Sequence, residues 1–286
     1  MSVFENFVQF LQGTMETPPS FGIFHICCVV AVIAAAVLLS YFFRNSDDKL
    51  IRRILLGVWI TLTVLEIYKQ LVFSMSVTDG VAAWHYQWYS FPFQLCSTPL
   101  YVLPFIVFLK DSKIRDAFII FFAGFAFFGG LVVMIYPNDV FTPMIGINIQ
   151  TMVHHGAQVA IGIMLAVRYR EKLVLRNLLG SFVIFLGFCA IATVLNEVVY
   201  AALQASGSGE VFNMFYFSRH FDCHLPILAD VCKALKGVSE LFCDIVFPVI
   251  YVVGFCGVSA LFFGIEKGIT VLVRRLAPAK AKETEE

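Results

Sequence analysis

The stretch Phe91-Pro92-Phe93-Gln94-Leu95-Cys96-Ser97 opens an apolar run that continues to Leu109. A helix of this length, at about 1.5 Å per residue, approaches the thickness of a bilayer. The stretch also places an amide, a thiol and a hydroxyl in the outer part of the run. Because polar groups in hydrocarbon are costly, they usually mark a functional position in a membrane protein. The stretch therefore predicts a transmembrane helix with a site near its outer end.

The composition is that of an integral membrane protein. Of the 286 residues, 59% are hydrophobic and 14% are charged, whereas a soluble domain is about 45–50% apolar and about 25% charged. The net charge is zero, so the composition gives no sign of nucleic-acid binding. No His/Cys spacing indicates a metal site, and we expect no cofactor.

Seven segments approach the roughly 20 apolar residues that a spanning helix needs. They are 21–43, 53–74, 91–109, 117–135, 148–167, 178–203 and 241–264. We therefore predict an all-α fold, a bundle of seven transmembrane helices in a membrane domain at 21–267. A short outside segment at 1–20 precedes this domain. A disordered tail at 268–286 follows it.

The basic residues predict the orientation of the bundle. Sixteen of the 20 Lys and Arg residues fall on the connections at one side or in the tail, and the short connections 75–90 and 136–147 contain none. The positive-inside rule then places the amino terminus outside and the carboxyl terminus in the cytoplasm. We expect a multi-pass protein of the plasma membrane, with its one long loop, 204–240, outside.

Polar side chains occur at matched depth in five of the predicted helices, within the outer third of the membrane. Spacing groups them on inward faces: Glu66 and Lys69 are separated by three residues, and His154 and Gln158 by four. Such faces line a bundle interior or a water-filled cavity. The candidate site residues are Glu66, Lys69, Gln94, Cys96, His154, His155, Gln158, Asn196 and Asp244.

A thiol and two imidazoles at one depth are what nucleophilic thiol chemistry requires. An imidazole takes the thiol proton, and a third group orients the imidazole. Glu66 or Asp244 would orient it, and Asn196 or Gln94 would donate to an oxyanion. Structural readings stay open for each residue: Glu66 and Lys69 as an ion pair, Asn196 as an interhelical hydrogen bond, and the cysteine as a packing residue.

The outside loop carries two further expectations. Residues 212–217 are too apolar for a free loop, so they dip back into the membrane or cap the bundle. Cys223 and Cys232 lie on the oxidising side, where they can pair as a disulfide.

Three stretches resemble the YwaF-like family of integral membrane proteins. They are the Phe91–Ser97 stretch, Val153-His154-His155-Gly156 and Asn213-Met214-Phe215-Tyr216-Phe217. That family is similar to an animal branch of multi-pass phospholipid acyltransferases with a cysteine nucleophile. The resemblance implies acyl transfer between membrane lipids through an acyl-cysteine at Cys96, with His155 as the base and His154 as the substitute. Gln94 stands where many relatives have histidine.

The first hypothesis is therefore a lipid acyltransferase, or a thioesterase-like enzyme, with a Cys–His pair near the outer leaflet. Two other functions remain open. A transporter, or a membrane protein that binds a lipid or small molecule without catalysis, needs polar residues along its pathway, and here the inner halves of the helices are mostly apolar. A seven-helix receptor fits the topology, but the third helix lacks an Asp-Arg-Tyr-like motif and the seventh lacks Asn-Pro-x-x-Tyr. The acyl donor, the acceptor and the oligomeric state are left open by the sequence.

Overall fold

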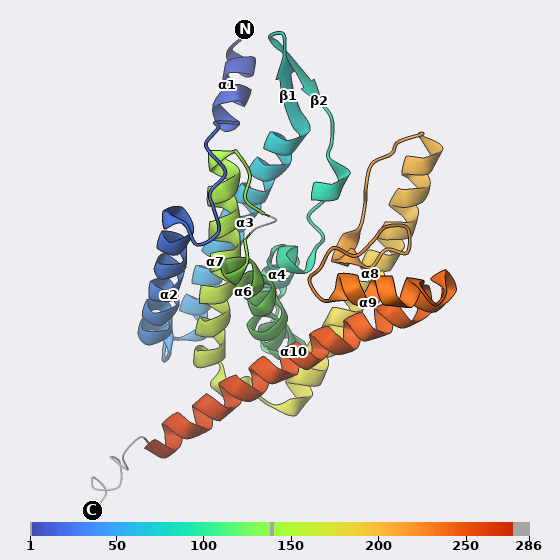
Figure 1. Ribbon diagram of the computed structural model, residues 1–286. Coiled ribbons are helices and arrows are strands. Elements are labelled where there is room, and N and C mark those ends of the chain that lie inside the picture. Colours follow the sequence, from blue (N-terminus) through green and yellow to red (C-terminus); the bar gives the residue numbers. More distant parts are fainter. Residues whose placement is uncertain (1, 138–139, 277–286) are drawn as a thin grey trace, which may run out of the picture.

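The computed structural model describes residues 2–137 and 140–276, and within them the fold is mainly helical (Figure 1). The longer helices are α1 Val3–Leu11, α2 Ile23–Phe43, α3 Asp48–Ser74, α4 Pro99–Phe108, α5 Lys113–Phe121, α6 Phe127–Ile135, α7 Ile145–Arg168, α8 Leu175–Ala205, α9 Leu228–Lys236 and α10 Glu240–Leu276. Short helical turns are η1 Trp88–Ser90, η2 Leu95–Ser97, η3 Phe122–Ala126, η4 Arg170–Lys172 and η5 Met214–Tyr216. The strands are β1 Met75–Thr78 and β2 Val81–Trp84.

Four stretches of helix are long and apolar enough to cross a membrane, judged by length and composition over the described residues. They are Ile23–Phe43, Lys113–Ile135, Leu175–Ala205 and Glu240–Leu272. Only 6% of the apolar window of α2 is buried inside the protein. A water-soluble protein does not expose an apolar surface of this size. The structure therefore agrees with a membrane protein.

Each of the seven predicted segments corresponds to helix in the structure, but the segment at 91–109 begins later than predicted. Helical structure starts at Leu95, and α4 itself starts at Pro99. Pro92 forces the preceding residue out of the helical region, and Phe91 has φ −51° and ψ 132°. The predicted helix is therefore wrong over its first turn, and Cys96 lies at the helix end.

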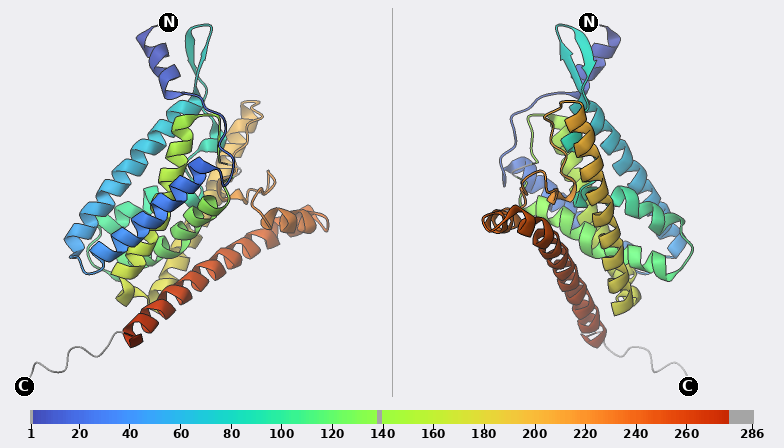
Figure 2. Two further views of the ribbon diagram at one scale, coloured as in Figure 1. Left: turned by 60° about the vertical axis from the view of Figure 1, so that its left-hand side comes forward. Right: turned by 90° about the vertical axis from the view of Figure 1, so that its right-hand side faces the viewer.

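The last helix is longer than predicted. α10 runs at a slant to the other helices and ends only at Leu276 (Figure 2). Residues 268–276, assigned to a disordered tail from the sequence, are therefore helical, because the apolar and basic side chains after 264 continue a helix-compatible pattern. The rest of that tail, 277–286, lies outside the described residues.

α7 is the central helix, and it lies between α2 and α6 (Figure 1). Glycines allow this close packing. A Cβ at Gly130 of α6 would come within 2.6 Å of both the Cβ of Gln158 and the carbonyl oxygen of His155. A Cβ at Gly156 of α7 would collide with Val32 of α2. Small residues at these crossings let membrane helices approach each other.

A β-hairpin and α1 project together from one end of the bundle (Figures 1 and 2). The hairpin turns at Asp79-Gly80, where φ is 53° and 75°. An Asp-Gly pair favours this left-handed turn, which matches the twist of paired strands. The sequence analysis treated 75–90 only as a short connection, and the hairpin within it is a feature that this dipeptide signals.

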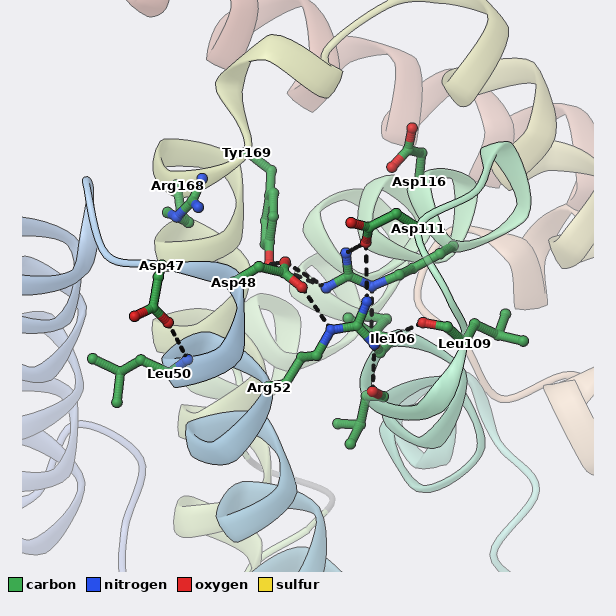
Figure 3. Close-up of polar contacts among 12 residues, drawn as sticks. Asp47, Asp48, Leu50, Arg52, Ile106, Leu109, Asp111, Asp116, Arg168 and Tyr169 are labelled. Atoms are coloured by element: carbon green, nitrogen blue, oxygen red, sulfur yellow. Dashed lines mark hydrogen bonds and ion pairs between the residues drawn. The ribbon is translucent and has the colours of Figure 1, made fainter.

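An arginine cluster (Asp48, Arg52, Asp111, Arg115 and Tyr169) ties α3, α5 and α7 together at the opposite end (Figure 3). The guanidinium of Arg115, 2% exposed, contacts Asp48 at 2.8 Å and Asp111 at 2.7 Å. Its Nε donates to the carbonyl of Ile106 at 2.8 Å. Burial by itself raises the pKa of Asp48, but hydrogen bonds from Tyr169, Arg52 and Arg115 lower it to about 2. Asp48 therefore stays ionised and fixes the ends of the three helices.

Candidate functional site

Cys96 lies at the amino end of a helical stretch, in the short turn η2 that leads into α4. It was expected five residues inside a helix. The N–H groups of a first helical turn lack partners within the helix and carry partial positive charge. Cys96 is partly exposed, and it lies at the end of the helix rather than inside it.

Two side chains of α7 hold the main chain of Cys96. His154 Nε2 and Gln158 Nε2 each lie 2.9 Å from the carbonyl oxygen of Cys96. The four-residue spacing places both on one face of α7, as the sequence predicted. The contact is made to the carbonyl, and among the described residues no hydrogen bond joins the Cys96 thiol to His154 or His155. α7 thus positions Cys96 through its backbone.

The hydrogen bonds of the two histidines define the protonation of their rings. A carbonyl oxygen only accepts, so His154 carries its proton on Nε2, which donates to Cys96. His155 carries its proton on Nδ1, which donates to the carbonyl of Thr151 at 2.7 Å. His154 Nδ1 and His155 Nε2 therefore present unprotonated lone pairs in the neutral rings.

These two nitrogens and Gln158 Oε1 are buried acceptors without a hydrogen-bond partner among the described residues. Buried polar atoms are nearly always paired, so each exception calls for an explanation. Here three exceptions occur on neighbouring turns of one helix, and two of them belong to His154 and Gln158, whose side chains contact the carbonyl of Cys96. The arrangement can accept protons or hydrogen bonds from a ligand or from water. This is the clearest indication of a functional site in the structure.

Glu66 and Lys69 form an ion pair at 2.9 Å on the inner face of α3. Gln70 Nε2 donates to Glu66 at 2.6 Å and to the carbonyl of Ser90 at 2.8 Å. The charges of Glu66 and Lys69 lie within electrostatic reach of Cys96 and His154. The pair is thus a structural contact, which was one of the two readings of the sequence. It is also the nearest source of charge to the site.

Gln94 and Asn196 hold the segment after α8. Gln94 donates to the carbonyl of Asn213 at 2.8 Å and accepts from the N–H of Phe215 at 2.7 Å. Asn196 donates to Met214 at 3.1 Å and accepts from its N–H at 2.7 Å. Because each amide is bonded at both ends to the main chain, these side chains position a loop. The oxyanion role expected for them has no support in this geometry.

The held loop packs into the bundle. The side chains of Phe212, Met214 and Phe215 are at most 1% exposed, which agrees with the prediction that this apolar segment caps the helices. Phe215 and Tyr216 adopt φ of 58° and 57°, a left-handed conformation that costs energy in residues with side chains. The side-chain amides of Gln94 and Asn196 stabilise this conformation. Gln94 lies two residues before Cys96 in the sequence.

Asp244 lies apart from the histidines. It lines a cavity of about 320 Å³, where Arg219 is bonded to Glu197 at 2.6 Å. Sequence depth matched Asp244 to the site, but depth does not fix the direction of a side chain around the helix. The expected role of Asp244 in orienting an imidazole is therefore not supported. The cavity is lined by Thr193, Asn196, Glu197, Phe217, Ser218, Arg219, Asp244 and Pro248.

Gly129 of α6 is a site residue that the sequence analysis missed. A Cβ at this position would lie 3.6 Å from both the Cα and the nitrogen of Cys96, and 3.5 Å from Gln158 Oε1. Gly129 therefore packs directly against the backbone of Cys96. The adjacent pair Gly129-Gly130 within an apolar helix was the available signal, because paired small residues mark close helix contacts.

Comparison with known proteins finds a family whose model matches this chain. No curated protein and no solved structure matches the chain. The family model of the TMEM164 family, a family of membrane proteins, matches residues 20–236. The match covers most of the chain and includes Cys96 and both histidines of α7, whereas Asp244 falls outside it. The chain belongs to the TMEM164 family.

Proposed function

We propose that this protein transfers an acyl group between membrane lipids through a thioester on Cys96. The Cys96 sulfur attacks the ester carbonyl of a phospholipid, and the bond to the glycerol oxygen breaks. The lysolipid leaves with the thiol proton, which passes through an imidazole. The hydroxyl of a second lysolipid then attacks the thioester, its proton returns to the thiolate, and a new ester forms.

The unpaired acceptors on His154, His155 and Gln158 of α7 carry this proposal. A base must be neutral and must have a free lone pair within reach of the proton it takes. His154 and His155 each present an unpaired ring nitrogen, and the His154 ring contacts the carbonyl of residue 96 through its other, protonated nitrogen. We therefore assign the base role to His154 first and to His155 second, which reverses the order implied by the family resemblance.

The supporting residues have distinct roles in this scheme. Gln158 fixes the carbonyl of Cys96, and Gly129 lets α6 pack against the backbone of Cys96. Glu66 and Lys69 supply the local field. The exposed apolar surfaces of α2 and α10 are suited to contact lipid, so a lipid substrate fits a site inside the bundle.

The proposal includes seven spans, with the amino terminus outside, in the plasma membrane. The alternation of basic connections supports it. A tag inserted at Gly207, in an exposed turn with φ 70°, should be reachable from outside intact cells. A tag found in the cytoplasm would invert the site toward the inner leaflet.

Acyl exchange in vesicles tests the reaction. The purified protein should move a labelled acyl chain from a phosphatidylcholine to an added lysophospholipid, and Cys96→Ala should abolish the exchange. Cys256→Ala, at a partly buried cysteine of α10, is the matched control and should retain it. Equal activity in both variants would refute the nucleophile.

A second candidate function rests on a different observation. The 320 Å³ cavity beside Asp244 is large enough for a small polar ligand or a lipid headgroup. It supports the reading of a binding protein without catalysis. Lipid binding that survives Cys96→Ala, in a protein with no acyl exchange, would favour this function over the first.

A further inference from the structure

Three of the eight cysteines gather where α9 meets α10. Cys232 of α9 and Cys243 of α10 place their sulfurs 3.6 Å apart, and the side chains are 6% and 3% exposed. The sequence had suggested Cys223 as the partner of Cys232. Cys223 is buried in the same cluster, but the structure brings Cys243 to Cys232 instead.

The chain between the two cysteines explains their meeting. α9 ends at Lys236, and the exposed turn Gly237–Ser239 reverses the chain. Ser239 then starts α10: its hydroxyl accepts from the N–H of Phe242 at 3.4 Å, and its carbonyl accepts from the N–H of Cys243 at 3.0 Å. This cap sets the first turn of α10 so that Cys243 faces back toward α9.

We propose that Cys232 and Cys243 are a site of disulfide formation, with a small-molecule disulfide as the oxidant. The thiolate of Cys232 attacks the small disulfide, whose S–S bond breaks, and one small thiolate leaves. The thiolate of Cys243 then attacks the Cys232 sulfur of the mixed disulfide and displaces the second small thiolate. The protein loses two electrons and two protons, and the small disulfide becomes two thiols.

The geometry favours this step. A disulfide has an S–S distance of about 2.05 Å, so the sulfurs must approach by about 1.5 Å from 3.6 Å. Because both sulfurs are covered, the first attack proceeds through opening of the exposed turn at Gly237–Ser239.

The disulfide would fix the turn between α9 and α10, close to the 320 Å³ cavity that Asp244 lines. Asp244 follows Cys243 directly, and Lys236 is bonded to Asp222 of the preceding loop at 2.7 Å. A disulfide between Cys232 and Cys243 would therefore hold α9 against the start of α10, next to the cavity residue Asp244. The inference is independent of the proposed acyl transfer, since none of these residues contacts Cys96 in the structure.

Thiol counting on the full-length protein tests the site. Protein in detergent is treated with oxidised glutathione, and free thiols are then labelled with a maleimide mass tag. Two of the eight thiols should become protected in the wild type, and unreduced digests should contain a peptide pair joined at Cys232 and Cys243. Cys223→Ser is the matched control and should still lose two thiols.

The single variants sharpen the test. In Cys232→Ser and Cys243→Ser the intramolecular disulfide cannot form. Treatment with oxidised glutathione should therefore not protect a pair of thiols in either variant. The wild-type peptide map does not depend on the folding of any variant. A pair joined at Cys223 and Cys232, or unchanged thiol counts in the wild type, would overturn the proposal.

Discussion

Replacing Arg115 by methionine tests whether the arginine cluster stabilises the bundle. Methionine keeps much of the length of the side chain but removes the guanidinium, so Asp48 loses one of its two ion-pair partners and the carbonyl of Ile106 loses a donor. Breaking a buried ion pair costs about 3–5 kcal/mol. Asp48 is 32% exposed and Asp111 is 77% exposed, so the contact with Asp111 adds little. We expect a loss of about 3 kcal/mol.

Thermal unfolding in detergent is the assay. A loss of about 3 kcal/mol corresponds to a fall of roughly 6–12 °C in Tm for a protein of this size class. Lys110→Met is the matched control, because it removes one positive charge from an exposed position in the loop that precedes α5. The control should change Tm by no more than about 2 °C. If Arg115→Met and Lys110→Met unfold at the same temperature, the cluster is not a stabilising element.

Three further predictions concern protonation, the histidines and the helix crossing. Because the pKa of Asp48 is lowered from 3.8 to about 2 in the folded protein, its contribution is complete above about pH 4 and is lost as the pH falls toward 2; Tm should drop over this range less steeply in Asp48→Asn than in the wild type. His154→Ala should slow alkylation of Cys96 by a membrane-permeant electrophile more than His155→Ala does, and equal rates would remove His154 from the site. Gly130→Ala should destabilise the protein by about 1–3 kcal/mol because its Cβ would overlap α7, whereas Gly187→Ala, with open space around it, should leave Tm unchanged or higher.

The sequence was sufficient for features that depend on local pattern. Long apolar runs predicted the helices, and four-residue spacing predicted that His154 and Gln158 share a face of α7. The apolar character of 212–217 predicted a segment packed against the bundle. Each of these follows from the periodicity of a helix or from the cost of exposing apolar side chains.

Features that depend on side-chain direction were not predictable in the same way. Depth in the membrane matched Asp244 to the histidines, but its helix presents it to the cavity that Glu197 and Arg219 also line. The amides of Gln94 and Asn196 bind a loop whose path the sequence does not define. Cys232 meets Cys243 because of a short turn and a serine cap, a tertiary detail that counting cysteines leaves open.

The most direct test of the central claim is to detect the acyl group on Cys96 itself. The protein is incubated with a phospholipid that carries an alkyne-tagged acyl chain, and the labelled peptide is identified by mass spectrometry with and without neutral hydroxylamine, which cleaves thioesters. We predict one hydroxylamine-sensitive acyl group, on the peptide that contains Cys96, and its absence in Cys96→Ala. Labelling that is absent from Cys96, or that persists unchanged in Cys96→Ala, would contradict it.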